Sequence, residues 1–246
     1  MSQSTGHPLA QDPGRHPAPL MLTRFIRMDM REAFHRLKVK LGLERLADVP
    51  PGLFDEPDSA IALQARELVQ KLSPGFMVNH VLRTYCFGMV MAHRNHMAID
   101  RELFYLAAVL HDLGLTDSLA EEAGSFEWVG ARKAREFCLK HGLRADRADL
   151  LHDAIALHSS VCIANLREPE VSMVHYGAGC DLLGIRYGEI PQQEMDLTLA
   201  RYPRQNFKQA FSVCLERQAE LKPKCHIAAH MGLGMAERVQ KTEFSE

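Results

Sequence analysis

The sequence lacks any long apolar run. No stretch approaches the roughly 18 uninterrupted apolar residues that a membrane-spanning helix needs, so we expect no membrane partner. The first residues, MSQSTGHPLAQDPGRHP, also lack a charged segment followed by an apolar one. We therefore expect no secretory signal and a cytoplasmic location.

A surplus of charge of either sign is missing as well. The 29 Lys and Arg residues nearly balance the 31 Asp and Glu residues, which gives a formal net charge of −2. A basic patch that would attract nucleic acid is therefore not expected. Hydrophobic residues make up 46% of the 246 residues, which is enough for a sizeable core and excludes a wholly disordered chain.

Paired cysteine motifs are absent. No two cysteines form a CxxC pair, which argues against a zinc ribbon and against a thioredoxin-type redox site. We expect buried, reduced thiols that act as small hydrophobic residues. The six cysteines are Cys86, Cys138, Cys162, Cys180, Cys214 and Cys225.

No segment alternates convincingly between apolar and polar residues, and apolar residues recur instead with helical spacing. We therefore expect a single all-α domain. Its predicted parts are a flexible N-terminal tail (1–20), helices that pack on the core (21–75), a main domain (76–222) and a C-terminal helical extension (223–246). The predicted helices of the main domain cover 76–94, 100–113, 125–141, 146–163, 171–185, 192–200 and 206–221.

Histidine is abundant, with 13 residues, and the most informative segment is DRELFYLAAVLHDLGLTD (100–117). Leu103, Ala107 and His111 share the buried stripe of an amphipathic helix. A histidine followed by Asp112 at the buried end of a helix is costly unless both side chains are used, and a metal ion offsets that cost. The alternative, a histidine at the helix C-terminus with Asp112 in solvent, stays open at this point.

Two other ionisable residues lie on apolar helix faces. The stretch FMVNHVLRTYCFG places His80 on the preceding helix, and VSMVHYGAGCDLLGIR places Asp181 on a later one. Two imidazoles and two carboxylates suit one divalent Zn, Fe, Mn, Co or Ni ion. Four protein ligands would leave one or two positions for water and substrate.

A second His-Asp pair, His152-Asp153, lies in the middle of a predicted helix without a following glycine. We expect this pair to be exposed and to take no part in the metal site. His226 and His230 are four residues apart, a spacing able to bind zinc. Because no carboxylate completes the set, we expect structural or solvent-facing roles for them.

The order H…HD…D across successive helices resembles the HD-domain metal-dependent hydrolases, and within them the branch that contains the cyanamide hydratases. The stretches that carry the resemblance cover about residues 76 to 225. They are HVLRTYCFG, ELFYLAAVLHDLGLT, SFEWVGARKAREFCLKHG, DAIALHS, GAGCDLLG, RYPRQNFKQAF and LKP. The resemblance implies an HD-domain helical bundle with a metal centre between core helices, and it implies His80, His111, Asp112 and Asp181 as ligands of one ion.

The resemblance also implies roles around the centre. His158 matches the histidine that follows the HD pair, which implies substrate binding or proton transfer, and either His158 or Asp112 would be the base. Glu127 is expected either to act as a pocket acid or base, or to stabilise a helix N-terminus. Arg83 is expected to position a ligand carboxylate or to bind substrate, and Trp128 to lie in the core or the pocket wall.

The expected activity is the addition of activated water to a small molecule, with a C–N substrate of the nitrile or cyanamide type favoured. One alternative is a phosphohydrolase of a nucleotide or a small phosphomonoester. Another is a non-catalytic, metal-stabilised module that binds a ligand. A di-iron oxygenase would need two further histidine ligands, and no clean second set is present. The expected partners are a small-molecule substrate and a second copy of the chain.

Overall fold

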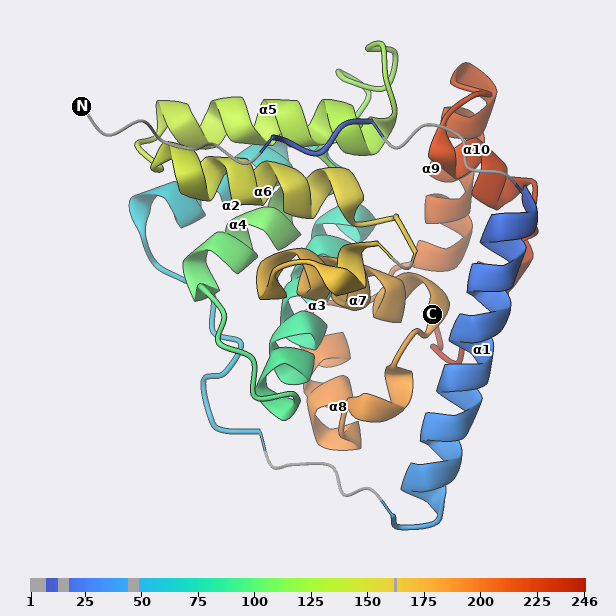
Figure 1. Cartoon of the computed structure of the whole chain (residues 1–246). Helices are drawn as coiled ribbons and strands as arrows, with labels where there is room; N and C mark the ends of the chain where they lie inside the picture. The colour runs from blue at the N-terminus through green and yellow to red at the C-terminus, as the bar shows by residue number, and fades with distance from the viewer. Residues whose placement is uncertain (1–7, 13–17, 44–48, 162) are drawn as a thin grey trace.

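The computed structural model describes residues 8–12, 18–43, 49–161 and 163–246, and Figure 1 shows the arrangement of its helices. Every regular element in these residues is helical, which confirms the all-α fold class. The described helices are α1 (Ala18–Lys40), α2 (Ala60–Leu72), α3 (Gly75–Arg94), α4 (Arg101–Leu110), α5 (Phe126–Lys140), α6 (Ala145–Leu157), α7 (Pro169–Leu183), α8 (Gln192–Arg201), α9 (Phe207–Leu221), α10 (His226–Met231) and α11 (Met235–Gln240). Three short 3₁₀ turns are η1 (Leu113–Leu115), η2 (Ala164–Leu166) and η3 (Tyr187–Glu189). No helix in the described ranges is long and apolar enough to cross a membrane.

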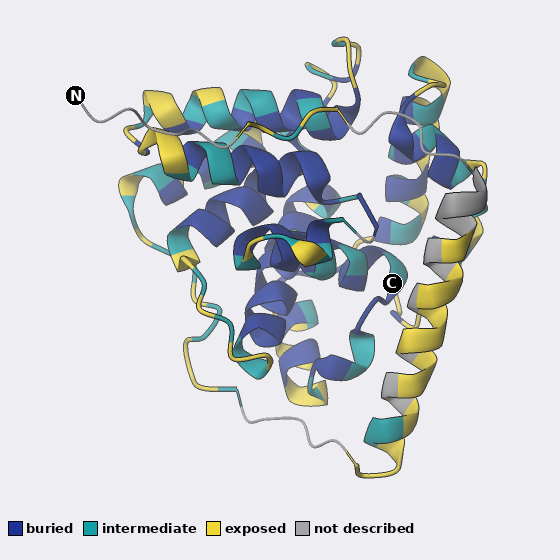
Figure 2. Cartoon of the chain, viewed as in Figure 1, coloured by how far each residue is buried: buried dark blue, intermediate teal, exposed yellow. Residues whose placement is uncertain are grey.

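Helix α3 is the centre of the core. Its sequence, GFMVNHVLRTYCFGMVMAHR, is apolar around most of its circumference, and such a helix is stable only when it is surrounded by others. It packs against α7 and α4, and α6 packs against both of those helices. Figure 2 shows these four helices as the buried middle of the molecule.

Two glycines allow α3 and α7 to cross closely. A Cβ atom on Gly177 would lie 2.2 Å from the carbonyl oxygen of Thr84, and one on Gly88 would lie 2.9 Å from that of Met173. Both contacts are too short for any side chain, so the two backbones touch. The consequence for function is that polar residues on α3 and α7 can share one buried place.

Two predicted helices end differently in the structure. The helix predicted over 146–163 ends at Leu157, because His158 is its C-cap and the backbone then turns, with Ser160 N donating to Leu157 O over 2.8 Å. The C-terminal segment is two short helices, α10 and α11. They are separated at Gly234, whose φ of +82° lies in the left-handed region that glycine adopts without strain.

The ends of the chain lie on the outside. Helix α1 runs along one side of the bundle (Figure 1), and its described side chains are mostly exposed (Figure 2). Ala10 N donates to Asp153 Oδ1 over 2.7 Å, and Asp12 Oδ2 accepts from Ser125 N over 2.8 Å, so residues 8–12 contact α6 and the start of α5. Residues 1–7 and 13–17 of the expected tail, and Cys162, lie outside the described residues. The division of the chain into four parts stays a prediction.

Candidate metal centre and its cavity

The His111-Asp112 pair lies where α4 ends. Asp100 caps the helix start by accepting from Leu103 N over 3.0 Å, and the helix ends at Leu110. The next turn, η1, packs directly on α5, since a Cβ atom on Gly114 would lie 2.0 Å from Phe126 O. This close approach explains the glycine after the HD pair, and it holds both His111 and Asp112 in the interior.

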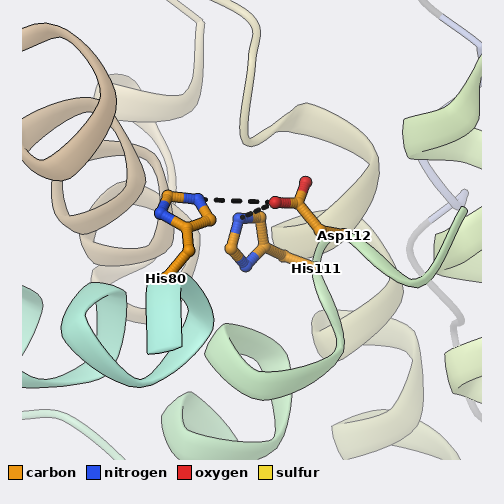
Figure 3. A group of neighbouring side chains, drawn as sticks. All are labelled: His80, His111 and Asp112. Carbon is orange, nitrogen blue, oxygen red and sulfur yellow. Dashed lines mark ion pairs between the residues drawn. The ribbon is translucent and has the colours of Figure 1, made fainter. Parts of the chain in front are cut away.

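Figure 3 shows the resulting cluster of His80, His111 and Asp112. Asp112 Oδ2 lies 3.2 Å from His111 Nε2 and 3.4 Å from His80 Nε2. The three side chains are 1%, 1% and 2% exposed. In the described part of the chain, their donor atoms all lie within 4.8 Å of one another. Three of the four residues expected to bind a metal therefore meet at one point.

The two imidazoles present lone pairs to this point. His111 Nδ1 donates to Ala108 O over 2.8 Å, and His80 Nδ1 donates to Asp181 Oδ2 over 2.7 Å, since an ionised carboxylate can only accept. The Nε2 atoms are then unprotonated in the neutral rings and face Asp112. Fixing the far nitrogen in this way is typical of metal-binding histidines.

The cluster fits a divalent transition-metal ion. Asp112 Oδ2 is buried and has no hydrogen-bond partner of acceptable geometry in the described residues, which is costly for a carboxylate oxygen unless a cation satisfies it. Burial alone would raise the pKa of Asp112, but the imidazoles of His111 and His80 outweigh burial and lower that pKa to about 2. Two nitrogens and one ionised oxygen form a donor set used by zinc and by non-haem iron.

Asp181, the fourth expected ligand, lies beside the cluster and is bound differently. Arg83 Nε donates to Oδ1 and Arg83 Nη2 to Oδ2, each over 2.8 Å, and Arg204 Nη1 donates to Oδ1 over 2.6 Å. The structure therefore confirms the expectation that Arg83 positions a carboxylate at the centre. It does not bring the oxygens of Asp181 into the group of donor atoms that His80, His111 and Asp112 form.

The cluster opens on a small cavity of about 60 Å³. The polar side chains that line it besides the cluster are His158, Ser159, His175 and His230. The other walls are mainly apolar and include Phe126, Val161, Leu182, Phe211, Leu215 and Met235. A substrate in this cavity would be close to the proposed metal position and largely shielded from water.

His158 faces the cluster from the end of α6, as expected. Its Nδ1 donates to Ile155 O over 2.7 Å, which leaves Nε2 as an acceptor, and Nε2 lies 3.8 Å from Asp112 Oδ1. Burial, together with the neighbouring His111, lowers the pKa of His158 to about 3, so the ring is neutral near pH 7. His175 Nδ1 donates to the carbonyl of His158 over 2.6 Å and holds this segment in place.

Glu127 lies behind the cavity wall, in the first turn of α5, and is fully buried. Its Oε1 accepts from Ser159 Oγ over 2.5 Å, and Ser159 lines the cavity. Burial raises the pKa of Glu127 to about 7, although the hydrogen bond from Ser159 opposes the shift. Sequence reasoning did not identify Ser159, because a serine after a helix end carries no periodic signal.

Trp128 is not brought to this cavity. The side chain is half-buried on the outer side of α5, where the guanidinium carbon of Arg132 lies 5.5 Å from its ring centroid. It borders a separate surface hollow with Gly124 and His152. Its neighbour Glu127 points inward, so one step along the helix separates the two faces.

The expectation that His152 and Asp153 are exposed is wrong. Both are buried, because α6 lies between other elements and residues 8–12 cover its outer side. His226 and His230 are also buried, with their Nε2 atoms 2.8 Å apart. His226 Nε2 lies 3.1 Å from Ser159 O, so this pair supports the cavity wall from α10.

Comparisons with known proteins agree with this geometry. The family model described as HD domain matches residues 77–200, a range that contains every residue of the cluster. Two proteins of Saccharomyces cerevisiae, Cyanamide hydratase DDI2 and Cyanamide hydratase DDI3, are each 24% identical to this chain over 194 residues. Each alignment covers 74% of this chain and 81% of the yeast protein. The resemblance seen in the sequence is thereby confirmed.

Proposed function

This chain belongs to the HD-domain family, and we propose that it is a metal-dependent enzyme that adds water to a small C–N compound. A nitrile or cyanamide-type substrate is favoured. The observation that carries the proposal is the buried cluster of His80, His111 and Asp112 at the wall of a small, mainly apolar cavity. The printed names of the two yeast relatives support cyanamide as the first substrate to test.

His80 Nε2, His111 Nε2 and Asp112 Oδ2 would hold the ion, and Zn, Fe, Mn, Co and Ni are all compatible with this set. A divalent ion bound there supplies Lewis acidity and brings the pKa of water in its coordination shell towards neutrality. The protein's part is to hold the three donors in a dry site. The resulting nucleophile suits an electrophilic carbon such as that of a C≡N group.

Two acceptors at the cavity orient the attacking water. His158 Nε2 and Asp112 Oδ1 lie 3.8 Å apart, so one water between them can donate a hydrogen bond to each. Asp112 would then bind the ion through one oxygen and direct the water through the other. Either residue can accept the proton that the water loses as its oxygen bonds to carbon.

The nitrogen of the substrate gains a proton in the same reaction. Ser159 Oγ lies at the cavity wall and donates to Glu127 Oε1. A protonated Glu127 can pass its proton to the Ser159 hydroxyl as that hydroxyl gives its own to the substrate nitrogen. A carboxyl group with a pKa of about 7 is suited to this role near neutral pH.

The size of the cavity favours a small, uncharged substrate. A single water needs about 10–15 Å³ of such volume, so a cavity of about 60 Å³ holds a molecule of only a few heavy atoms. No Lys or Arg side chain is among its described lining residues. Nucleotide or phosphomonoester hydrolysis is therefore the weaker candidate, since phosphate sites normally use such cations.

The test begins with the metal content of full-length protein purified without a His tag and without added metal. Hydration of cyanamide and small nitriles, and hydrolysis of phosphomonoesters, are then assayed before and after chelation. We expect about one equivalent of a transition metal and a chelator-sensitive hydratase activity. Metal without turnover on any C–N compound would favour a ligand-binding module, and turnover on phosphomonoesters would favour the phosphohydrolase.

The matched variants are His111→Ala and His96→Asn. His96 is exposed just after the end of α3, with a φ of +51° that asparagine tolerates. The first variant is expected to lose metal and activity together, and the second to keep both. Full activity in His111→Ala would contradict the proposal.

We also propose a cytoplasmic location and a homo-oligomer. The five described cysteines are free thiols, which supports a reducing compartment. Large apolar side chains exposed on α1 support a second copy of the chain as partner. They are Ile26, Met30, Phe34, Leu37 and Leu41. Light scattering of the wild type and of Phe34→Glu tests this proposal, and a monomeric wild type would contradict it.

A further inference from the structure

Asp181 is the buried carboxylate at the centre that the proposed mechanism does not use. It lies on α7 and is fully buried, between Arg83 on α3 and Arg204 in the segment before α9. The guanidinium groups of both arginines lie over the ring of Phe207, with their central carbons 5.1 and 4.8 Å from its centroid. The carboxylate is therefore held in one position from two sides.

The hydrogen bonds to Asp181 use its full acceptor capacity. An ionised carboxylate offers about four lone-pair positions. Oδ1 accepts from Arg83 Nε and Arg204 Nη1, and Oδ2 accepts from Arg83 Nη2 and His80 Nδ1, over distances of 2.6 to 2.8 Å. Four donors occupy four positions, so no lone pair remains for a metal ion.

The direction of the contact leads to the same result. His80 meets Asp181 through Nδ1 and Asp112 through Nε2. These two nitrogens point away from each other on the imidazole ring, so Asp181 and the donor cluster lie on opposite sides of His80. A carboxylate that accepts from the far nitrogen of a metal-bound histidine fixes its tautomer and its orientation.

Asp112 differs from Asp181 on both counts. Its Oδ2 has no hydrogen-bond partner in the described residues, and it lies on the Nε2 side of both His80 and His111. The nearest charged groups of Asp181, in contrast, are two guanidinium cations, which repel a divalent cation. Only one of the two aspartates is arranged to bind a metal.

We propose that Asp181 is a positioning residue that orients His80, and that the centre has three protein ligands, His80 Nε2, His111 Nε2 and Asp112 Oδ2. The remaining coordination positions then stay open for water and substrate, as in catalytic two-histidine, one-carboxylate sites. The assignment rests on the proposed function, because it requires that the chain binds a metal. It replaces the expectation, based on resemblance, that Asp181 is itself a ligand.

The test compares two Asp→Asn variants of the full chain, Asp181→Asn and Asp112→Asn, by titration of metal-free protein with Co²⁺. For Asp181→Asn we expect affinity to fall about 10- to 100-fold. At saturation its visible absorption spectrum should match the wild type, because the ligand atoms are unchanged. For Asp112→Asn we expect a different spectrum or no uptake. A changed spectrum at saturation in Asp181→Asn, or no uptake by that variant while its circular dichroism is native, would overturn the assignment.

A second measurement does not depend on the folding of a variant. In crystals of the Co²⁺-loaded wild type, the anomalous peak should lie about 2.0–2.2 Å from the three proposed ligand atoms. No oxygen of Asp181 should lie at bonding distance, and one that does would overturn the assignment while leaving the proposed function intact. If the folded wild type takes up no metal, the proposed function fails and the assignment fails with it.

Discussion

The chain contains the dipeptide His-Asp twice, and the two copies have different surroundings. His111-Asp112 follows α4 and His152-Asp153 lies within α6, and both pairs are buried. Asp112 Oδ2 has no hydrogen-bond partner in the described residues, and two imidazole Nε2 atoms lie within 3.4 Å of it. The carboxylate of Asp153 is instead fully engaged in hydrogen bonds and an ion pair.

The partners of Asp153 are structural. Oδ1 accepts from Ala10 N over 2.7 Å and lies 3.3 Å from His152 Nδ1, while Oδ2 accepts from Arg167 Nη2 over 3.0 Å. These contacts tie residues 8–12 and the segment before α7 to α6. The comparison teaches that burial of a His-Asp pair does not make a metal site. The availability of the carboxylate lone pairs does.

The largest effect is expected from removing one imidazole of each pair. His111→Ala should lose its metal, and with it several kcal/mol of transition-state stabilisation, or about three orders of magnitude in kcat/KM. His152→Ala should keep its metal and its activity. Metal analysis and steady-state kinetics of both variants measure this, and equal losses in the two would break the comparison.

The next effect concerns the acid beside the first pair. Glu127→Gln should lower kcat about 100-fold or more, the usual contribution of a general acid. Because the acid must be protonated and its pKa is about 7, wild-type activity should fall as the pH rises above about 7. Ser159→Ala should show a similar loss in kcat, and an unchanged kcat in Glu127→Gln would leave Glu127 with only its structural role.

The same raised pKa links Glu127 to folding. Its folded pKa of about 7 lies above the ordinary value of 4.5, so the folded state binds a proton more strongly than the unfolded chain. This contribution to stability is fully present below about pH 4.5 and is lost as the pH rises through about 7. Glu127→Gln should flatten the pH dependence of the unfolding free energy in that range.

A smaller effect, on stability alone, is expected at the second pair. Asp153→Ala removes the acceptor of two buried or half-buried donors and should cost about 1–3 kcal/mol of unfolding free energy. Burial opposes ionisation of Asp153, but the hydrogen bonds from His152 and Ala10 outweigh it and lower its pKa. Its contribution is therefore present at neutral pH and lost as the pH falls through the folded pKa.

Chemical denaturation at pH 7 measures the effect of Asp153→Ala, with metal content as the second readout. The control is Asp117→Ala, whose side chain is 90% exposed and whose replacement should change stability little. Loss of metal in Asp153→Ala would place the second pair in the functional site and contradict the comparison.

The smallest effect is expected at Arg167, which pairs with Asp153 at the protein surface. Its side chain is 26% exposed, so the pair is partly screened by solvent and Arg167→Ala should cost about 0.2–1 kcal/mol. The cost should shrink at high salt. Denaturation at low and high ionic strength measures it, and a cost as large as that of Asp153→Ala would mean that Arg167 carries most of the second network.

Much of the first pair's environment could be predicted locally. Helical periodicity placed His111 on the same stripe as Leu103 and Ala107, and all three are buried. The glycine after the pair predicted a break, and α4 ends just before it. His80 was predicted in the same way, from an apolar helix with one ionisable residue on its inner face. Such predictions succeed because the periodicity of a helix is a local property of the sequence.

The second pair shows where this reasoning stops. Its exposure was predicted from the position of His152 within one helix, but the segment that covers Asp153 comes from Ala10, 143 residues earlier. Ser159 likewise acquires its role from Glu127, which is 32 residues away and on another helix. Contacts between distant segments leave no periodic signal in either one.

The sequence by itself determined an all-α chain with a buried His-Asp pair and a histidine on a neighbouring helix, because helix periodicity and the cost of burying charge are local rules. Only the tertiary structure decided which carboxylates keep a lone pair. Asp181 is engaged by Arg83, 98 residues before it, and by Arg204, 23 residues after it, whereas Asp112 meets no such donor. A carboxylate oxygen binds what packs against it, and packing between helices is set by the whole fold.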